Sequence, residues 1–346
     1  MCLLSCQPSG LIEADLTNLK SSETRISADE LYTTIQTIAL EKTEKSLLSY
    51  PTLIAIGDSG LIVADRNELL RFDREGKYKN NIGVFGHGEG EHGVPYGVSY
   101  DSNTHVVYVF SPPDEVLKYN IDGRYLGRFT MELGGDDMFL SSCWSQALGV
   151  YVAETRLYKD KGVEINIRTF SSDGQKHGVY QLYSDDSPVA TNFIRGSKMR
   201  PADDGVFVMV PYDDTIYRLD KDGLAPQYVI NRGKHTPTRE LVENADNTSK
   251  LDKQCYYIDN MVVTPKYFYL YVAADNGYND VLINREDGSV VHNCHYNNND
   301  ETSHMKTIDG RYSFWPWCGH GTTVGTLVEN TENVECNPNI VVAVEK

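Results

Sequence analysis

A short turn recurs along the chain about every fifty residues, and this repeat limits the fold more than any other feature. In each copy an apolar or aromatic residue stands four or five positions before the glycine of an Asp-Gly or Glu-Gly pair. The five copies end at Gly76, Gly123, Gly174, Gly223 and Gly288, with separations of 47, 51, 49 and 65 residues. Because glycine adopts the positive φ that tight hairpin turns require, each copy predicts a β-hairpin.

Short apolar runs precede each turn, at 61–64, 106–110, 150–153, 206–210 and 269–273. A further strand before each run and one after each turn make four strands per period, which is typical of a β-propeller blade. The sequence therefore predicts an all-β, six-bladed β-propeller of four-stranded antiparallel blades. We expect the blades at about 51–85, 94–131, 138–183, 191–230, 255–294 and 305–346.

The two ends of the chain supply the closure of the ring. Residues 339–344 have the composition of a strand but no turn or partner after them, and residues 33–40 stand alone before the first blade. Pairing these strands would close blade 6 and remove exposed sheet edges. The propeller domain would thus span 30–346, after a tether at 1–29, and the longest interval predicts an insertion at about 231–253.

Charge excludes two classes of partner. The chain has 32 Lys and Arg against 49 Asp and Glu, a formal net charge of −17. This field repels phosphate backbones and anionic membrane surfaces, so we expect no nucleic-acid partner and no membrane contact except through a lipid anchor.

The first six residues, Met-Cys-Leu-Leu-Ser-Cys, resemble the end of a bacterial lipoprotein signal, with Leu3 and Ser5 placed before Cys6. The resemblance implies lipidation of Cys6, a leader ahead of Met1, and a cell-envelope location, periplasmic or outer-membrane-anchored, in a Gram-negative bacterium. The alternative is an ordinary N-terminus that contains two cysteines. The other five cysteines form no CxxC pair and are expected to be small buried hydrophobes.

Several segments resemble known propellers. Residues 84–98, followed by a Tyr-Val strand and 119–123, are similar to an NHL-type repeat. Residues 38–48, 86–91 and 337–342 resemble the six-bladed β-propeller lipoproteins of Bacteroides-type gut bacteria. The resemblance implies the fold but says little about function, because the matching positions are turn and strand residues.

Loops between the second and third strands of a blade, and loops between blades, lie on one face of a propeller around the channel mouth, where ligands usually bind. The first group contributes Arg66, Arg156, Tyr212, Asp213 and Asp275, and the second contributes His87, His92, Tyr96, Asn192 and Arg195. Such residues could hold a sugar, a peptide or a carboxylate. The alternative is that these loops are polar because they face water.

Trp315 and Trp317 flank Pro316, which cannot donate a ladder hydrogen bond in a central strand. The pair could form an exposed platform for a sugar ring or peptide, or it could pack in the core of the sixth blade. His320 follows closely and is a further ligand-binding candidate.

Metal sites are weakly indicated. His292 and Cys294 would share one face of a strand with His295 on the other, so one zinc ion could not take all three. In lactonase-like six-bladed propellers a calcium ion occupies the channel, and the resemblance in fold makes Asp58, Asp259 and Asn260 the candidate donors. Calcium is thus the one candidate cofactor.

These features favour an extracytoplasmic, lipid-anchored, monomeric binding or scaffold propeller that recognises a glycan, a peptide or a cell-envelope protein. The alternative is a metal-dependent propeller enzyme of the lactonase, amidating-lyase or glycan-lyase kind. Convergence of His87 or His92, Tyr212 and Arg66 around a cation would favour the enzyme. The absence of a compact catalytic motif favours the binding role.

Overall fold

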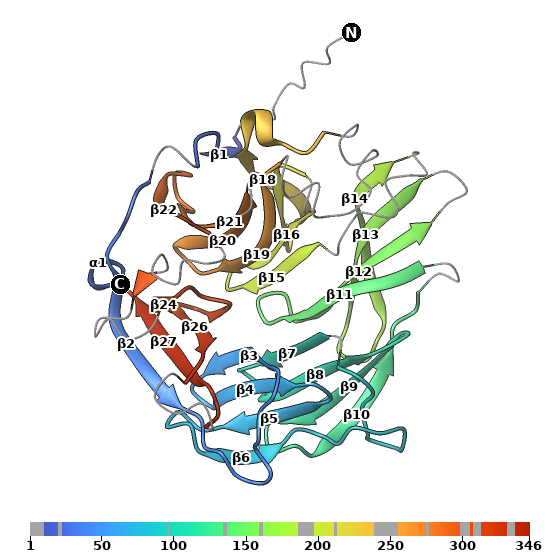
Figure 1. The fold of residues 1–346 in the computed structure, drawn as a ribbon. Helices are drawn as coiled ribbons and strands as arrows, with labels where there is room; N and C mark the ends of the chain where they lie inside the picture. The colour runs from blue at the N-terminus through green and yellow to red at the C-terminus, as the bar shows by residue number, and fades with distance from the viewer. Residues whose placement is uncertain are drawn as a thin grey trace.

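The computed structural model describes residues 10–19, 23–95, 97–133, 137–158, 162–185, 197–210, 213–238, 255–274, 277–297, 305–306, 313–330 and 336–346. Six antiparallel sheets radiate around a central axis (Figure 1). The inner strands contact one another in a closed order, β3 to β7, β11, β15, β19, β25 and back to β3. The predicted all-β, six-bladed propeller is therefore confirmed.

The strands of each blade follow one another from the axis outward. Blade 1 has β3 (Pro51–Gly57), β4 (Gly60–Asp65), β5 (Glu68–Phe72) and β6 (Tyr78–Asn81). Blade 2 has β7 (Gly97–Asp101), β8 (Val106–Ser111), β9 (Glu115–Asn120) and β10 (Tyr125–Thr130). Blade 3 has β11 (Asp137–Ser145), β12 (Val150–Tyr158), β13 (Val163–Phe170) and β14 (Lys176–Asp185). Blade 4 has β15 (Lys198–Ala202), β16 (Gly205–Met209), β17 (Thr215–Asp220) and β18 (Gly223–Asn231). Blade 5 has β19 (Tyr257–Val263), β20 (Tyr267–Ala274), β21 (Gly277–Asn284) and β22 (Val290–Asn297).

Blade 6 combines both ends of the chain. Its strands are β25 (Cys318–His320), β26 (Thr323–Val328), β27 (Asn339–Glu345) and β2 (Tyr32–Ala39). β2 pairs antiparallel with β27, from Thr34 opposite Val344 to Ala39 opposite Asn339, as expected for the closing strand. The blue strand beside the red one in Figure 1 is this closure. A separate ribbon of β23 (Met305–Lys306) and β24 (Ser313–Phe314) precedes the blade.

Part of the segment expected to be a tether is a strand. β1 (Ile12–Asp15) pairs in parallel with β18 and gives blade 4 a fifth strand. The side chains of Ala14, Leu16 and Leu19 are buried between blades 4 and 5, which is why this segment packs on the propeller. The chain then reaches β2 through the short helix α1 (Ala28–Leu31). A 3-10 turn, η2 (Gly233–His235), lies just after blade 4.

The core lies between the blades. Each of the six interfaces between neighbouring blades contains one cluster of buried apolar side chains. Alternation along each strand sends one set of side chains to the preceding blade and the other to the following blade. The propeller is therefore a ring of six similar sheet-on-sheet contacts around the channel.

The repeat glycines form the outer contacts between blades. Gly76, Gly123, Gly174, Gly223 and Gly288 all have positive φ and stand at the turn between the third and fourth strands of a blade. A Cβ on Gly123 would lie 2.2 Å from the backbone oxygen of Asn81 in the preceding blade, and Gly76 meets the oxygen of Ala39 in the same way. These positions need glycine both for the turn and for the close approach.

Candidate functional site

The inner strands of all six blades enclose a central cavity of about 1070 Å³. Its wall includes polar side chains from Ser99, Ser142, Arg200, Asn260 and Thr326, so the channel is not simply an apolar core. A concave site of this size with a few convergent polar groups is the part of the molecule best suited to bind a ligand.

The two tryptophans around Pro316 have different environments. Trp315 is buried, and its ring lies 5.3 Å from that of Tyr269 and 5.6 Å from that of His292, so it packs in the core. Trp317 is 47% exposed and lines the cavity just before β25. Of the two interpretations of this segment, the core position therefore applies to Trp315. Trp317 is exposed and faces the channel.

An aromatic stack supports Trp317. Its ring centroid lies 5.3 Å from that of Tyr271, which stacks at 4.5 Å on Tyr278. The backbone N–H of Trp317 donates to the carbonyl of Gly325 at 3.0 Å. The indole is thus held in one place at the channel mouth, and we refer to Trp317, Tyr271 and Tyr278 as the aromatic shelf.

Charged residues stand at the same end of the channel. Lys198 and Asp259 occupy the beginnings of β15 and β19, and their Nζ and Oδ1 atoms are 3.8 Å apart. The Lys198 ammonium also lies 6.0 Å from the centre of the Tyr257 ring. A cation and a carboxylate beside an aromatic face can orient a polar ligand by charge-assisted hydrogen bonds.

Deeper in the channel, Arg200 donates to the carbonyl of Met261 at 2.6 Å and to Asn260 Oδ1 at 2.6 Å. The thiols of Cys143 and Cys318 line the same cavity. Burial raises the pKa of each thiol to about 12, so both are neutral near pH 7 and poor nucleophiles. The channel centre is better suited to binding than to thiol chemistry.

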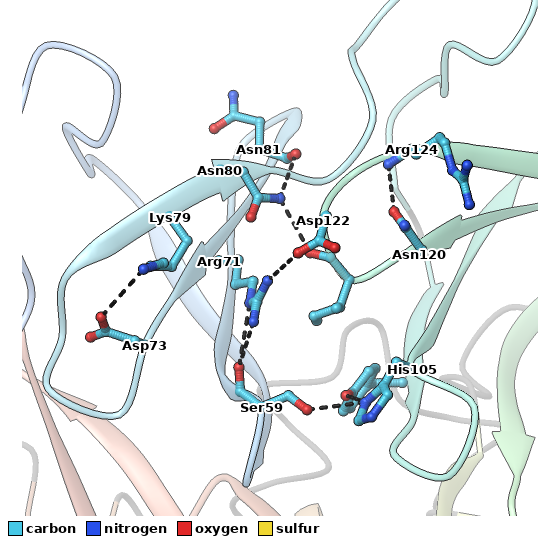
Figure 2. A network of polar contacts seen from close by, with 12 residues as sticks. Ser59, Arg71, Asp73, Lys79, Asn80, Asn81, His105, Asn120, Asp122 and Arg124 are labelled. Atoms are coloured by element: carbon cyan, nitrogen blue, oxygen red, sulfur yellow. Dashed lines mark hydrogen bonds and ion pairs between the residues drawn. The ribbon is translucent and has the colours of Figure 1, made fainter.

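The opposite end of the channel has its own polar groups. Ser102, in the β7–β8 turn, donates to Gln146 Oε1 at 2.9 Å and lies 3.4 Å from His320 Nε2. His105 in the same turn lies 3.1 Å from Ser59 Oγ, as Figure 2 shows, and its Nδ1 is 2.7 Å from the Tyr100 hydroxyl. His320 therefore lines the cavity at the end away from Trp317, on the face of the β3–β4 and β7–β8 turns.

The remaining described candidates from the loops do not line the cavity. Arg66 lies over the exposed ring of Tyr50, 5.1 Å from its centre, and His87 is exposed in the loop between blades 1 and 2. His92 is buried, with Nδ1 2.9 Å from the carbonyl of Gly93. None of these three residues lines the central cavity, so the structure does not bring them together there.

Two other predicted residues have local partners. The Arg156 guanidinium is buried and paired with Glu154 Oε1 at 3.2 Å, so it is not available at the surface. Asp213 accepts from the backbone N–H of Thr215 at 3.0 Å, and burial raises its pKa. Tyr96, Asn192, Arg195, Tyr212, Asp275 and Cys6 lie outside the described residues.

The calcium donors predicted from the fold do not come together. Asp58 is exposed in the β3–β4 turn beside Arg74, Asp259 pairs with Lys198, and Asn260 accepts from Arg200. Cations therefore occupy the oxygens that a calcium ion would need. Across the part of the chain that the structure describes, no three His, Cys, Asp or Glu side chains are grouped to hold a metal.

Exposed apolar side chains gather on the face that carries Trp317. Ten large apolar residues of the described chain are substantially exposed, and two of them, Leu126 and Val179, lie on outer strands. The other eight flank the inter-blade loops or the loops after second strands: Leu47, Tyr50, Val84, Phe85, Val94, Met138, Tyr158 and Trp317. These eight residues are distributed over several blades on the Trp317 face.

One residue of the histidine-rich segment of blade 5, His292, is buried. His292 Nδ1 accepts from the backbone N–H of Ile26 at 3.2 Å, and burial lowers the pKa of His292 to about 4. Below its unfolded pKa of about 6.5 the unfolded chain gains a proton that the folded chain does not. Between pH 7 and pH 5 this histidine should therefore reduce the free energy of unfolding by about 2 kcal/mol.

Denaturant unfolding of the wild type and of His292→Asn at both pH values measures this contribution. Asparagine keeps an acceptor for Ile26 but does not titrate. The stability of the variant should fall less between pH 7 and pH 5 than that of the wild type. An equal fall in the two proteins would show that His292 is not the responsible group.

Comparison with known proteins agrees with the architecture. The fold and the central cavity define the chain as a six-bladed β-propeller with an internal channel. Residues 11–338 match the family model described as "Domain of unknown function (DUF4934)", and the chain belongs to this family. No functionally curated protein matches the sequence. No helix in the described ranges is long and apolar enough to cross a membrane.

Several solved structures are similar to this chain at low sequence identity. A "Putative exported protein" from Bacteroides fragilis has a TM-score of 0.67 and 16% identity, covering 97% of this chain and 99% of that one. BamB from Moraxella catarrhalis has a TM-score of 0.43 and 13% identity over 90% of this chain and 99% of that one. A Bacteroides caccae protein of unknown function has a TM-score of 0.42 and 10% identity over 82% of this chain and 84% of that one.

Proposed function

We propose that this chain is an extracytoplasmic binding propeller that holds a glycan at the Trp317 end of its channel. The observation that carries the proposal is the aromatic shelf, in which the exposed indole of Trp317 packs on Tyr271, and Tyr271 stacks on Tyr278, at the mouth of a large cavity. This aromatic surface offers a sugar ring an apolar face, and Lys198 and Asp259 at the same end of the channel offer hydrogen-bonding partners.

The location outside the cytoplasm has separate support. The Bacteroides fragilis protein of the same fold is described as exported. The opening residues of this chain, with Leu3 and Ser5 before Cys6, resemble the end of a bacterial lipoprotein signal. We therefore place the propeller in the cell envelope, anchored through Cys6, with the membrane contacted only through that lipid.

A binding role fits the channel better than the alternative of a metal-dependent enzyme. Asp58, in the β3–β4 turn, lies away from Asp259 and Asn260 at the beginning of β19, and each of the three contacts a cation of the protein. His92, one of the proposed catalytic histidines, is buried against Gly93 and Tyr119. The groups that such an enzyme would need are not assembled in the described part of the chain.

Substitution of Trp317 tests the proposal. We expect Trp317→Ala to weaken glycan binding at least about tenfold, because a central aromatic contact commonly contributes more than 1.4 kcal/mol to binding. Isothermal titration calorimetry with neutral and acidic oligosaccharides of several linkages measures the affinity. Thermal unfolding of the variant verifies that it is folded.

Phe85→Ala is the matched control, since Phe85 is 43% exposed on the same face but does not line the cavity. Its affinity for the glycan should equal that of the wild type. Equal loss in both variants, or no binding of any oligosaccharide by the wild type, would reject the proposed site. Binding of short peptides in place of glycans would assign the shelf to a different ligand class.

A further inference from the structure

Arg200 is a cation whose partners among the described residues are all uncharged. Its Nε donates to the carbonyl of Met261 at 2.6 Å, its Nη1 to the carbonyl of Met199 at 2.9 Å, and its Nη2 to Asn260 Oδ1 at 2.6 Å. These bonds use three of the five guanidinium N–H donors. Among the described residues, nothing accepts from the other two, and no carboxylate lies within ion-pair distance.

Other interior arginines of this chain are paired with carboxylates. Arg71, Arg156, Arg232 and Arg285 have side chains no more than 17% exposed, and each has a carboxylate oxygen within 3.2 Å. Figure 2 shows the closest parallel, in which Arg71 donates to the carbonyl of Ser59 and to Asp122 at 2.7 Å. Arg200 likewise donates to a carbonyl and to a side chain of the next blade, but where Arg71 has the carboxylate of Asp122, Arg200 has the neutral amide of Asn260.

The surroundings do not neutralise Arg200 either. The nearby thiols of Cys143 and Cys318 are uncharged, because burial raises the pKa of each to about 12. Asp259 lies at the channel wall but is 3.8 Å from Lys198, the second cation on the same side of β15. Asp203, at the β15–β16 turn, is exposed at the far rim.

An uncompensated cation inside a cavity is unfavourable unless something pairs with it. It is also unexpected in a chain with a net charge of −17, where carboxylates are abundant. A planar carboxylate could accept from the two remaining N–H donors at once, the geometry in which arginine binds this group most strongly.

We propose that Arg200 receives the carboxylate of the channel ligand, which is therefore an acidic sugar, a uronate-containing oligosaccharide. This inference rests on the proposed glycan-binding function and narrows its ligand class. Lys198 stands two residues before Arg200 and so faces the same side, which gives the channel two cations along β15. Binding should weaken as salt is added, since part of the attraction is between charges.

The test compares galacturonate and glucuronate oligosaccharides with their methyl esters, which keep the sugar but lose the charge. We expect the acids to bind the wild type at least about tenfold more tightly than the esters, the effect of one charge-assisted hydrogen-bonded pair. Arg200→Met should bring the acids to the affinity of the esters. Arg71→Met is the matched control, because it removes an arginine between blades outside the cavity and should leave the preference unchanged.

The outcomes separate this inference from the proposed function. Equal binding of acids and esters by the wild type would overturn the role of Arg200 while leaving a glycan site at Trp317. No binding of any oligosaccharide would overturn both. If Arg200→Met does not fold, the comparison of acid with ester on the wild type still decides, and Arg200→Lys, which keeps the charge but not the two-pronged geometry, should retain part of the preference.

Discussion

Replacing Glu154 by alanine should lower the free energy of unfolding by about 3–5 kcal/mol, the usual effect of leaving one partner of a buried ion pair alone. The Glu154 carboxylate is fully buried and accepts from Arg156, from Ser141 Oγ at 2.9 Å and from the backbone N–H of Ser197 at 2.8 Å. Its removal takes the carboxylate away from the buried Arg156 guanidinium and leaves the backbone N–H of Ser197 without this acceptor. Equilibrium unfolding in guanidinium chloride measures the loss.

Glu115→Ala is the control for this experiment. Glu115 pairs with Arg128 at 3.3 Å, but the two side chains are 35% and 56% exposed. An exposed pair contributes about 0–1 kcal/mol, so this variant should remain close to the wild type. If Glu154→Ala were equally mild, the buried pair would not be a structural element, and Arg156 would return to the residues considered for ligand binding.

Gly123→Ala should also be strongly destabilising. We expect a loss of about 2–5 kcal/mol, because alanine would carry the cost of a left-handed backbone, about 1–2 kcal/mol, together with that of a forced contact, about 1–3 kcal/mol. The glycine has a φ of +88°, and the new Cβ would lie 2.2 Å from the oxygen of Asn81. Thermal and denaturant unfolding report the change.

Gly149→Ala separates the two contributions. Gly149 has a φ of +63°, but nothing lies within 4 Å of an added Cβ. This variant should therefore lose only the backbone part, about 1–2 kcal/mol. Equal losses at Gly123 and Gly149 would show that the approach of neighbouring blades does not require glycine.

Most of the architecture could be predicted because local sequence patterns indicate its strands and turns. Hairpin glycines and alternating strands are recognisable from residues that are close in the sequence. The strands at the two ends had no local partner, so their pairing with each other could be predicted. β1 was not predicted, although Ile12, Ala14 and Leu16 alternate with polar residues. Its partner, β18, lies more than two hundred residues away, and no local signal indicates a parallel pair at that distance.

The site was harder to predict than the fold. Trp317 was found because its side chain and the adjacent proline are conspicuous, but polarity in a loop does not tell whether a residue reaches the channel. Lys198 and Arg200 alternate on an inner strand, and that spacing was the available signal. Whether a cation there is neutralised depends on residues such as Asn260, sixty positions later, so only the assembled ring shows it.

The contact at the repeat glycines bears on how such rings can arise. At Gly76 and Gly123 the atom met on the preceding blade is a backbone oxygen, which every residue type provides. If a blade were duplicated within a gene, its glycine turn could thus pack against the backbone of the preceding blade whatever the sequence of that blade. Its own outer strand could in turn contact the glycine turn of the following blade. Neighbouring repeats can then diverge in sequence without losing this contact, provided that each keeps its own glycine.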